Sequence, residues 1–380
     1  MVTSKYSCIL FKPIDILLIV FILSFIVQLA YHWIVFARLA FYKSKIKTTT
    51  GNQAVSVVIV ARNEYHNLIK TLEPILNQDY PDFEVVVVND NSDDESHFYL
   101  RELSKKYKHL KVVQIDQNLN FFSGKKFPLS IGIKSAQYDT LLLTDADCIV
   151  PSNKWISYMQ QSVQEKTQIV LGYGPYKSEP GFLNKLIRFD TFMAALHYLS
   201  FALLRMPYMG VGRNLAYSKS MFYKRNGFIN HYKINSGDDD LFINQAANKI
   251  NTSICIAPES FTYSIPEKQL GLWLKQKKRH LSTSGLYKLK HRLLLMFYPI
   301  SLFLFYVSSI ILLVLNSWLI VVLVLFTLRL LSFFLIQKSA LPKLKEQKLL
   351  LLSPILELLL YTSQGLAMAL GVFNRKNKWK

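Results

Sequence analysis

Cysteine is scarce in this chain of 380 residues. Its three cysteines, Cys8, Cys148 and Cys255, lie far apart, and none belongs to a Cys-x-x-Cys pair. This number and spacing exclude a disulfide framework and a cysteine-rich metal site, so we expect reduced, ordinary residues in a cytosolic setting. The sequence also lacks internal repeats and low-complexity linkers.

Acidic residues are few as well, at 25 against 45 lysines and arginines, which gives a net charge of +20. Such an excess ordinarily indicates nucleic acid or an anionic surface as the partner. Most of it falls in four windows that flank apolar segments, namely 38–47, 275–292, 337–348 and 374–380. Basic flanks of this kind are typical of membrane proteins. We therefore expect membrane lipids and no nucleic acid as partners, with residues 38–292 in the cytoplasm by the positive-inside rule.

Long apolar runs occur only towards the two ends of the chain. Residues 14–37 are long enough to span a bilayer, and a signal peptide is disfavoured because the run is too long and lacks a small-residue cleavage site. Residues 293–336 hold enough apolar sequence for two spans, with a break near Asn316. A third run, 349–373, is interrupted by proline and polar residues. For that run, spanning, re-entrant and interfacial placements all stay open.

These features divide the chain into three parts. Residues 1–50 are an N-terminal transmembrane helix with a basic linker, 51–292 a cytoplasmic domain with interfacial helices, and 293–380 a membrane region of two to three helices with a basic tail. In the middle part, short apolar runs alternate with helix-like stretches. Strands are predicted at 56–61, 84–89, 111–115 and 140–144, and helices at about 64–77 and 125–136. This alternation predicts an α/β fold with a mainly parallel sheet covered on both faces.

Acidic side chains fall where these strands end. Glu64 follows the first strand, Asp90 the second, and Asp145 and Asp147 the fourth. Ligands of a parallel sheet bind outside the carboxyl ends of its strands, and oxygen ligands favour Mg²⁺ or Mn²⁺. An Asp-x-Asp alone is more often turn chemistry. Its position after a buried strand nevertheless favours a divalent-metal site at Asp145 and Asp147, where the cation could also bind diphosphate oxygens.

Several motifs occur in an order that resembles glycosyltransferase family 2, the inverting nucleotide-sugar enzymes with a GT-A fold. They are "VSVVIVARNE", "VVVVNDNSDDES", "GKKFPLSIGIKSA", "TDADC", "SGDDDLF" and "QKKRH". The resemblance covers roughly residues 53–285. It implies a Rossmann-like GT-A domain that transfers a sugar from a nucleotide diphosphate to an acceptor at the inner face of a membrane.

The resemblance also implies a set of donor-binding residues. Asp90 would touch the nucleotide base, and Gln276 and Arg279, three apart on one helical face, would contact the diphosphate. Lys125 or Lys126 could add positive charge near the phosphates, although solvated surface explains these lysines about equally well. The full donor-side set is Glu64, Asp90, Lys125, Lys126, Asp145, Gln276 and Arg279.

Three adjacent acids in "SGDDDLF" exceed what a helix cap requires. Alignment with the family's acidic motif implies that Asp239 is the general base, with Asp238 as the second candidate. Proximity of like charges could raise one pKa towards a useful value.

Acceptor-side residues are implied in two segments. Gly212, Arg213 and Asn214 in "GVGRNLAYSKSMF" resemble the family's acceptor segment, and a turn into a strand explains them nearly as well. His280 stands where the family has an acceptor-contacting tryptophan, which disfavours processive synthesis. Residues 181–206 form either an interfacial helix on the route of a lipid-linked acceptor, the preferred interpretation, or a core helix.

Together these features predict a membrane-anchored, metal-dependent inverting glycosyltransferase on the cytoplasmic face of the inner membrane. A UDP-sugar is the expected donor, with a GDP-sugar second, and the acceptor is lipid-linked or a glycan. Two alternatives are a processive polysaccharide synthase and a non-catalytic nucleotide-sugar-binding membrane subunit, although the latter would need no base. Residues 272–285 also fit an amphipathic helix that binds lipid headgroups, and such a helix could close over the site as well.

Overall fold

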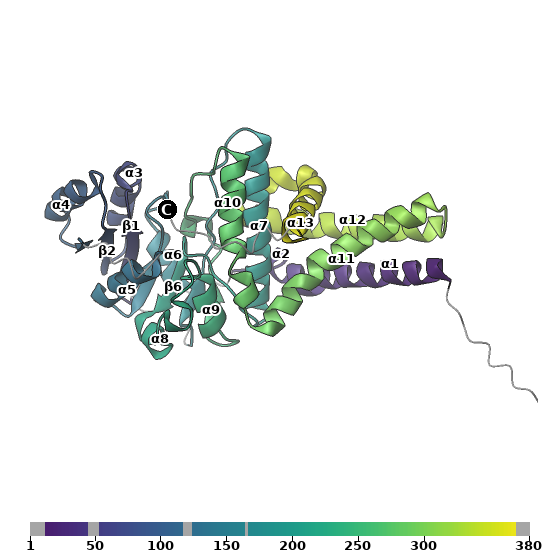
Figure 1. Ribbon diagram of the computed structural model, residues 1–380. Coiled ribbons are helices and arrows are strands. Elements are labelled where there is room, and N and C mark those ends of the chain that lie inside the picture. The colour runs from purple at the N-terminus through teal and green to yellow at the C-terminus, as the bar shows by residue number, and fades with distance from the viewer. Residues whose placement is uncertain (1–11, 45–52, 117–123, 164–165, 370–380) are drawn as a thin grey trace, which may run out of the picture.

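Figure 1 shows the computed structural model, in which an α/β domain lies at one end and long apolar helices extend from it. It describes residues 12–44, 53–116, 124–163 and 166–369. Cys8, the end of the first basic window from residue 45 onward, and the basic tail 374–380 lie outside the described residues.

The sheet has seven strands in the order β3-β2-β1-β4-β6-β5-β7. They are β1 (Val55–Ala61), β2 (Phe83–Asp90), β3 (Leu110–Ile115), β4 (Thr140–Leu143), β5 (Ile169–Leu171), β6 (Leu215–Ser218) and β7 (Thr252–Ile254). Strands β3, β2, β1 and β4 are mutually parallel, with Val57 opposite both Val85 and Leu142. Strand β6 is antiparallel to β4 and β5, and β7 is parallel to β5. The four predicted strands and the mainly parallel sheet are confirmed.

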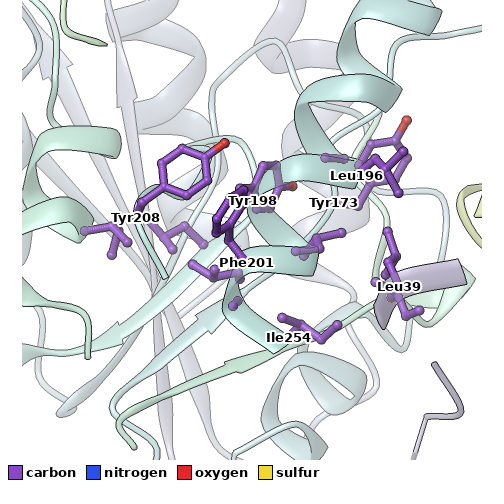
Figure 2. Close-up of a cluster of buried hydrophobic side chains, with 14 of the residues drawn as sticks. Leu39, Tyr173, Leu196, Tyr198, Phe201, Tyr208 and Ile254 are labelled. Carbon is purple, nitrogen blue, oxygen red and sulfur yellow. The ribbon is translucent and has the colours of Figure 1, made fainter. Parts of the chain in front are cut away.

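Helices cover both faces of the sheet because alternate residues of a buried strand point to opposite sides. Val57 and Ile59 of β1 belong to the core shared with α3, α4 and α6, whereas Val58 belongs to the core shared with α5 and α7. The helices of the domain are α3 (Tyr65–Leu76), α4 (Ser96–Lys106), α5 (Lys126–Ser135), α6 (Trp155–Gln161), α7 (Phe182–Leu203), α8 (Lys219–Lys224), α9 (Asp240–Ala246) and α10 (Leu270–Leu281). Figure 2 shows the α7 side, where Tyr198 and Phe201 gather with Ile254 of β7 and Leu39 from the N-terminal helices.

Helix α7 lies inside the protein. Fifteen of its 22 residues are buried, and it packs against β7 and the apolar helices at both ends of the chain. Two charged residues of this segment are paired internally, Arg188 with Glu346 and Asp190 with Lys277 of α10. The preferred interfacial placement of residues 181–206 is therefore wrong, and core packing describes the segment.

Three helical segments are long and apolar enough to cross a membrane, Pro13–Ala40, Leu289–Val314 and Leu319–Leu344. The first joins α1 (Pro13–Ala30), a π-helical stretch (Tyr31–Phe36) and α2 (Ala37–Ala40), and the others are built on α11 (Leu289–Val314) and α12 (Leu319–Ala340). The turn between α11 and α12 contains Asn316 in a left-handed conformation with φ of +53°, at the predicted break. Phe21 of α1 stacks on Phe305 of α11 with ring centroids 5.0 Å apart.

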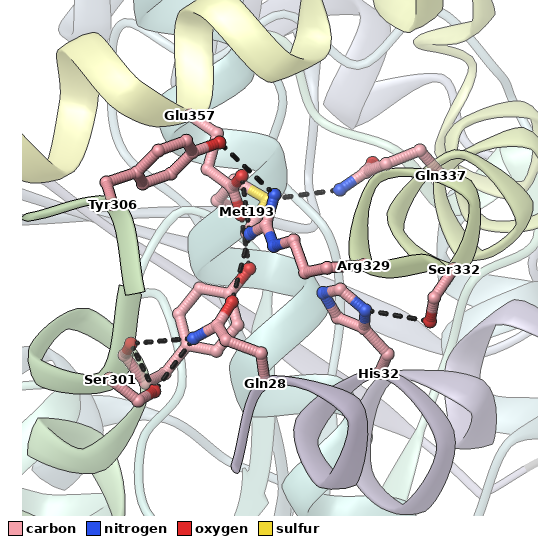
Figure 3. Close-up of polar contacts among 10 residues, drawn as sticks. Gln28, His32, Met193, Ser301, Tyr306, Arg329, Ser332, Gln337 and Glu357 are labelled. Atoms are coloured by element: carbon pink, nitrogen blue, oxygen red, sulfur yellow. Dashed lines mark hydrogen bonds and ion pairs between the residues drawn. The ribbon is translucent and has the colours of Figure 1, made fainter. Parts of the chain in front are cut away.

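Helix α13 (Ser353–Ala369) carries the third apolar run. It packs against α7 and α11 and lies beside the α/β domain, not along the outer end of the α11–α12 hairpin (Figure 1). A buried polar network fastens it there (Figure 3). Glu357 Oε2 lies 2.8 Å from Arg329 Nη2 of α12, Arg329 donates to Gln28 Oε1 of α1 at 2.9 Å, and Tyr298 of α11 donates to Glu357. Hydrocarbon offers no partners to such groups, so they must satisfy one another.

Glu357→Ala should destabilise the protein by about 3–5 kcal/mol, because it leaves the Arg329 guanidinium buried without a counter-charge. The midpoint of thermal unfolding in detergent measures this loss. The double variant Arg329→Met/Glu357→Leu removes both charges and should recover most of the stability. If Glu357→Ala unfolded at the wild-type temperature, the stabilising role given to the Arg329–Glu357 pair would be contradicted.

Candidate active site at the carboxyl edge of the sheet

The Asp-x-Asp carboxylates lie directly after β4, whose residues Leu141 to Leu143 are buried. Asp145 pairs with the ammonium of Lys125, the residue that precedes α5. Burial favours a neutral carboxyl, but Lys125, with help from Arg213 and Arg279, lowers the pKa of Asp145 below its ordinary value. Asp145 therefore stays ionised at neutral pH.

The loop that carries Lys125 is held close to the acidic motif. Gly124 has φ of +96°, and a Cβ added there would lie 2.6 Å from the carbonyl oxygen of Asn235, so only glycine allows this approach. Burial disfavours the charge of Lys125, yet Asp145, Asp238 and Asp239 raise its pKa above the ordinary value. Lys125 thus lies between the Asp-x-Asp pair and the acidic motif.

Asp147 is suited to a divalent cation. Burial and the neighbouring Asp145 raise its pKa, against the opposing charge of Arg213, and a bound cation would relieve that repulsion. Ligand atoms of Asp145, Asp147 and Cys148 lie within 4.8 Å of one another. Burial and the two aspartates raise the pKa of the Cys148 thiol to about 12, so the thiol stays protonated. Two carboxylates remain as donors, and this oxygen set fits Mg²⁺ or Mn²⁺.

Glu64 and Asp90 complete the edge on the side of β1 and β2. Burial raises the pKa of Glu64, and Asp147 and Asp145 raise it further, which indicates that the three carboxyls share one region. Burial also raises the pKa of Asp90, while Arg62, 3.9 Å away, opposes the shift. Glu64 therefore lies in the region of the Asp-x-Asp pair, and Asp90 stands at the end of the neighbouring strand β2.

Asp239 accepts two backbone hydrogen bonds, from the N–H of Gly212 at 2.7 Å and from the N–H of Asp240 at 2.7 Å. These bonds fix both carboxyl oxygens. Burial and the charges of Asp238 and Asp240 raise the pKa of Asp239 to about 7. A carboxyl with this pKa can take a proton near neutral pH, as a general base must.

Asp240, the third acid of the motif, has a structural role. It is buried and accepts hydrogen bonds from the hydroxyls of Thr283 and Tyr287, the latter at 2.7 Å. These bonds join the start of α9 to the segment that leads into α11. The third acid thus anchors the motif to the base of the membrane helices.

Lys126 does not reach the position that a phosphate-binding lysine needs. Its ammonium is buried and donates to the carbonyl oxygens of His231 and Ile234, at 2.6 and 2.9 Å, and burial lowers its pKa to about 8. The proposal of Lys126 as a donor-binding residue is therefore corrected. It holds the segment that precedes the acidic motif.

The segment around Gly212 is a turn into strand β6, as its alternative interpretation held. Asn214 is fully buried, and its amide bonds the carbonyls of Tyr173 and Ser260 and the indole N–H of Trp155. All hydrogen bonds of the Asn214 amide are therefore made within the fold, and its assignment as an acceptor-side residue is wrong. Arg213, by contrast, lies beside the Asp-x-Asp pair, where its charge helps to lower the pKa of Asp145 and opposes the rise in the pKa of Asp147.

Helix α10 brings Gln276 and Arg279 to the site. Tyr176 donates to Gln276 Oε1 at 3.2 Å, and the charge of Arg279 contributes to the lowered pKa of Asp145. His280, at the tryptophan position, is exposed. Tyr176 is a site residue that sequence reasoning missed, because it follows β5 in a segment without any motif, and only the fold brings it to α10.

The mainly parallel sheet with acids at its carboxyl edge agrees with a GT-A fold, and a family model matches part of the chain. Residues 56–230 match the model of Glycosyl transferase family 2. The chain carries a glycosyl transferase family 2 domain.

Several proteins are similar to this chain. The probable glycosyltransferase YdaM of Bacillus subtilis is 28% identical over 235 residues, covering 59% of this chain and 54% of YdaM. The beta-monoglucosyldiacylglycerol synthase of Nostoc sp. is 30% identical over 155 residues, covering 40% of this chain and 32% of that protein. The poly-beta-1,6-N-acetyl-D-glucosamine synthase of Staphylococcus epidermidis is 28% identical over 142 residues, covering 34% and 32%. The chain thus spans about a third to a half of the length of these relatives.

A solved structure supports the fold over nearly the whole chain. The mannosyltransferase PcManGT from Pyrobaculum calidifontis, in complex with GDP-Man and Mn²⁺, matches with a TM-score of 0.56 and 16% identity, covering 90% of this chain and 97% of PcManGT. At this identity the likeness concerns the fold alone.

Lys125→Met should strengthen the binding of Mn²⁺ alone by about fivefold, because the ammonium competes with a cation for Asp145 and such a partly exposed pair is worth ~1 kcal/mol. Calorimetric titration with MnCl₂ measures it. Lys134→Met, at an exposed lysine of α5, the helix that follows Lys125, serves as the control and should bind like wild type. Weaker Mn²⁺ binding by Lys125→Met would contradict the competition.

Proposed function

We propose that this protein transfers a sugar from a nucleotide-diphosphate sugar, with a UDP-sugar as the expected donor, to a lipid-linked or glycan acceptor. One observation carries the proposal. The turn at Gly212 and Arg213 joins two sites, since Gly212 donates to Asp239 and the Arg213 carbonyl accepts from Thr144, directly before Asp145. A candidate metal pair and a candidate base thus meet at one edge of the sheet.

The residues divide the chemistry between them. Asp239 takes the proton of the acceptor hydroxyl while the acceptor oxygen bonds to the anomeric carbon. The bond from that carbon to the diphosphate oxygen breaks, and a single displacement of this kind inverts the anomeric configuration. Lys125 and Arg279 supply fixed positive charge where negative charge develops on the leaving group. A divalent cation held by Asp145 and Asp147 would add Lewis-acid stabilisation of the same diphosphate.

The arrangement of the apolar helices supports a multi-pass protein with its catalytic domain on the cytoplasmic face of the inner membrane. Helix α1 runs towards the domain, α11 leaves it, and α12 returns to it (Figure 1). Basic residues within 38–44, 275–292 and 337–348 therefore lie on the side of the domain, in agreement with the positive-inside rule. Because α13 packs beside α7, it need not cross the membrane, and three spans are enough for this topology.

Single addition to a membrane acceptor is favoured over processive synthesis. Only three segments of the described chain are suited to span a membrane, and His280 lies exposed where an acceptor-stacking tryptophan would be expected. Only a short segment with one 3-10 turn (Ser284–Leu286) separates α10 from α11, so an acceptor anchored in lipid could reach the site. A non-catalytic subunit is disfavoured because the raised pKa of Asp239 would serve no purpose in binding alone.

Calorimetry with UDP, GDP and CDP, with and without Mn²⁺, tests the donor. One nucleotide should bind in a metal-dependent way, and Asp147→Ala should weaken it by at least about tenfold, or 1.4 kcal/mol. Asp79→Ala, an exposed acid in the turn before β2, is the matched control. If the folded wild-type protein bound none of the three nucleotides, the nucleotide-sugar proposal would fail.

The transfer rate should rise with pH through about 7 and then level off, because only the ionised form of Asp239 accepts a proton and its pKa is raised to about 7. Asp239→Asn should lower kcat by about 10²- to 10⁴-fold while nucleotide affinity is retained. A rate profile from pH 5 to 9 on the purified protein measures both. Unchanged transfer by Asp239→Asn would reject Asp239 as the base and bring Asp238 forward.

A further inference from the structure

Within the part of the chain that the structure describes, Arg213 forms no close ion pair, unlike the buried Arg188 and Arg329. Arg188 and Arg329 pair with Glu346 and Glu357. Within the described chain, no carboxylate lies within 4.0 Å of the Arg213 guanidinium and no acceptor bonds its side chain, while its Nη1 is shielded from solvent. A guanidinium carries five donors and is costly to leave unsatisfied, so this side chain has unused binding capacity.

The position of Arg213 is built and not incidental. Its carbonyl oxygen accepts from the hydroxyls of Thr144 and Thr262, each at 2.9 Å, and the preceding N–H donates to Asp239. Its guanidinium carbon lies 4.5 Å above the centre of the Tyr176 ring. Stacking on an aromatic ring orients the planar fork while leaving its donors available.

Tyr176 also connects Arg213 with α10. Its ring is buried and packs with Ile187 and Trp273, and its hydroxyl donates to Gln276 at 3.2 Å. Tyr176 thus holds the guanidinium of Arg213 with its ring and the amide of Gln276 with its hydroxyl. Groups fixed in this way are suited to one ligand, not to two separate ones.

The balance of charge indicates the ligand. The carboxylates of Asp145, Asp147 and Glu64 are balanced in number by three cations in the same region, Lys125, Arg213 and Arg279. Adding a divalent cation would leave an excess of two positive charges, which matches the two negative charges of a sugar diphosphate ester. Arginine binds phosphate oxygens in bidentate fashion.

We propose that Arg213, stacked on Tyr176, binds the diphosphate of the donor and belongs to the leaving-group side of the site, not to its acceptor side. The inference rests on the proposed function and adds a residue to it. Tyr176 is the positioning residue, because it holds Arg213 and Gln276 in one orientation. Arg213 then balances the charge that grows on the departing diphosphate.

Calorimetry of the nucleoside diphosphate that the wild-type protein binds, chosen from UDP, GDP and CDP, tests the proposal. Arg213→Met should weaken that binding by about 10- to 100-fold, both with Mn²⁺ and in EDTA, while affinity for the corresponding free nucleoside stays unchanged. The affinity of Arg213→Lys should lie between those of wild type and Arg213→Met, because an ammonium keeps the charge but cannot form the bidentate contact. Tyr176→Phe should lose less affinity for the nucleoside diphosphate than Tyr176→Ala, since phenylalanine keeps the ring on which Arg213 stacks.

Two controls separate binding from folding. Arg101→Met, an exposed arginine of α4, should bind like wild type. Arg213→Met should unfold close to the wild-type temperature, because the Arg213 side chain forms no hydrogen bond or close ion pair that the substitution would remove. An unfolding midpoint clearly below wild type would assign Arg213 to the fold and overturn the proposal.

The outcomes distinguish this inference from the proposed function. If wild type binds a nucleoside diphosphate and Arg213→Met binds it equally well, Arg213 does not bind the donor, and this inference is rejected alone. Loss of transfer with unchanged diphosphate binding would place Arg213 on the acceptor side and reject it as well. If wild type binds no nucleotide at all, the proposed function fails first.

Discussion

Carboxylates withdrawn from bulk water need compensation, and the arrangement of the active edge depends on how this protein supplies it. Asp145 is compensated by Lys125, Asp239 by two backbone N–H groups, and Asp240 by two hydroxyls. In each of these cases, at least one compensating group comes from a distant part of the chain. The acids therefore act as fastenings as well as chemical groups, because each one holds a loop from another element against the carboxyl edge of the sheet.

Adjacent residues of the same type have different hydrogen-bond and ion-pair partners, and these partners separate their roles. Asp239 and Asp240 are adjacent, yet only Asp240 is closed off by hydroxyl donors. Lys125 and Lys126 are adjacent too, yet one faces a carboxylate and the other two backbone carbonyls. Neighbours on a chain point in different directions at a helix start, so a motif of identical residues can contain one chemical group and one structural group.

Local patterns account for what could be predicted from the sequence. The unbroken apolar runs of β1, β2, β3 and β4 and the acids that follow them are signals within a few residues, and all four strands are present in the sheet. Strands β5 and β7 are only three residues long, too short for any period to show. Core packing of α7 is the less favoured interpretation of the sequence because its charged residues indicate an interface, and a partner such as Glu346 lies more than 150 positions away from Arg188. Tyr176 was missed because its two contacts depend entirely on tertiary structure.

The core on the α7 side of the sheet does not stop at the boundary between domain and membrane helices. Leu39 and Phe36 from the first apolar segment, Tyr298 of α11 and Phe333 of α12 belong to the same buried cluster as Phe189 and Leu196 of α7. Most residues of α7 are buried within the protein. The membrane helices are consequently part of the protein's interior and not an exchangeable anchor. A change in bilayer thickness or tension that tilts them acts directly on the scaffold that carries the candidate site.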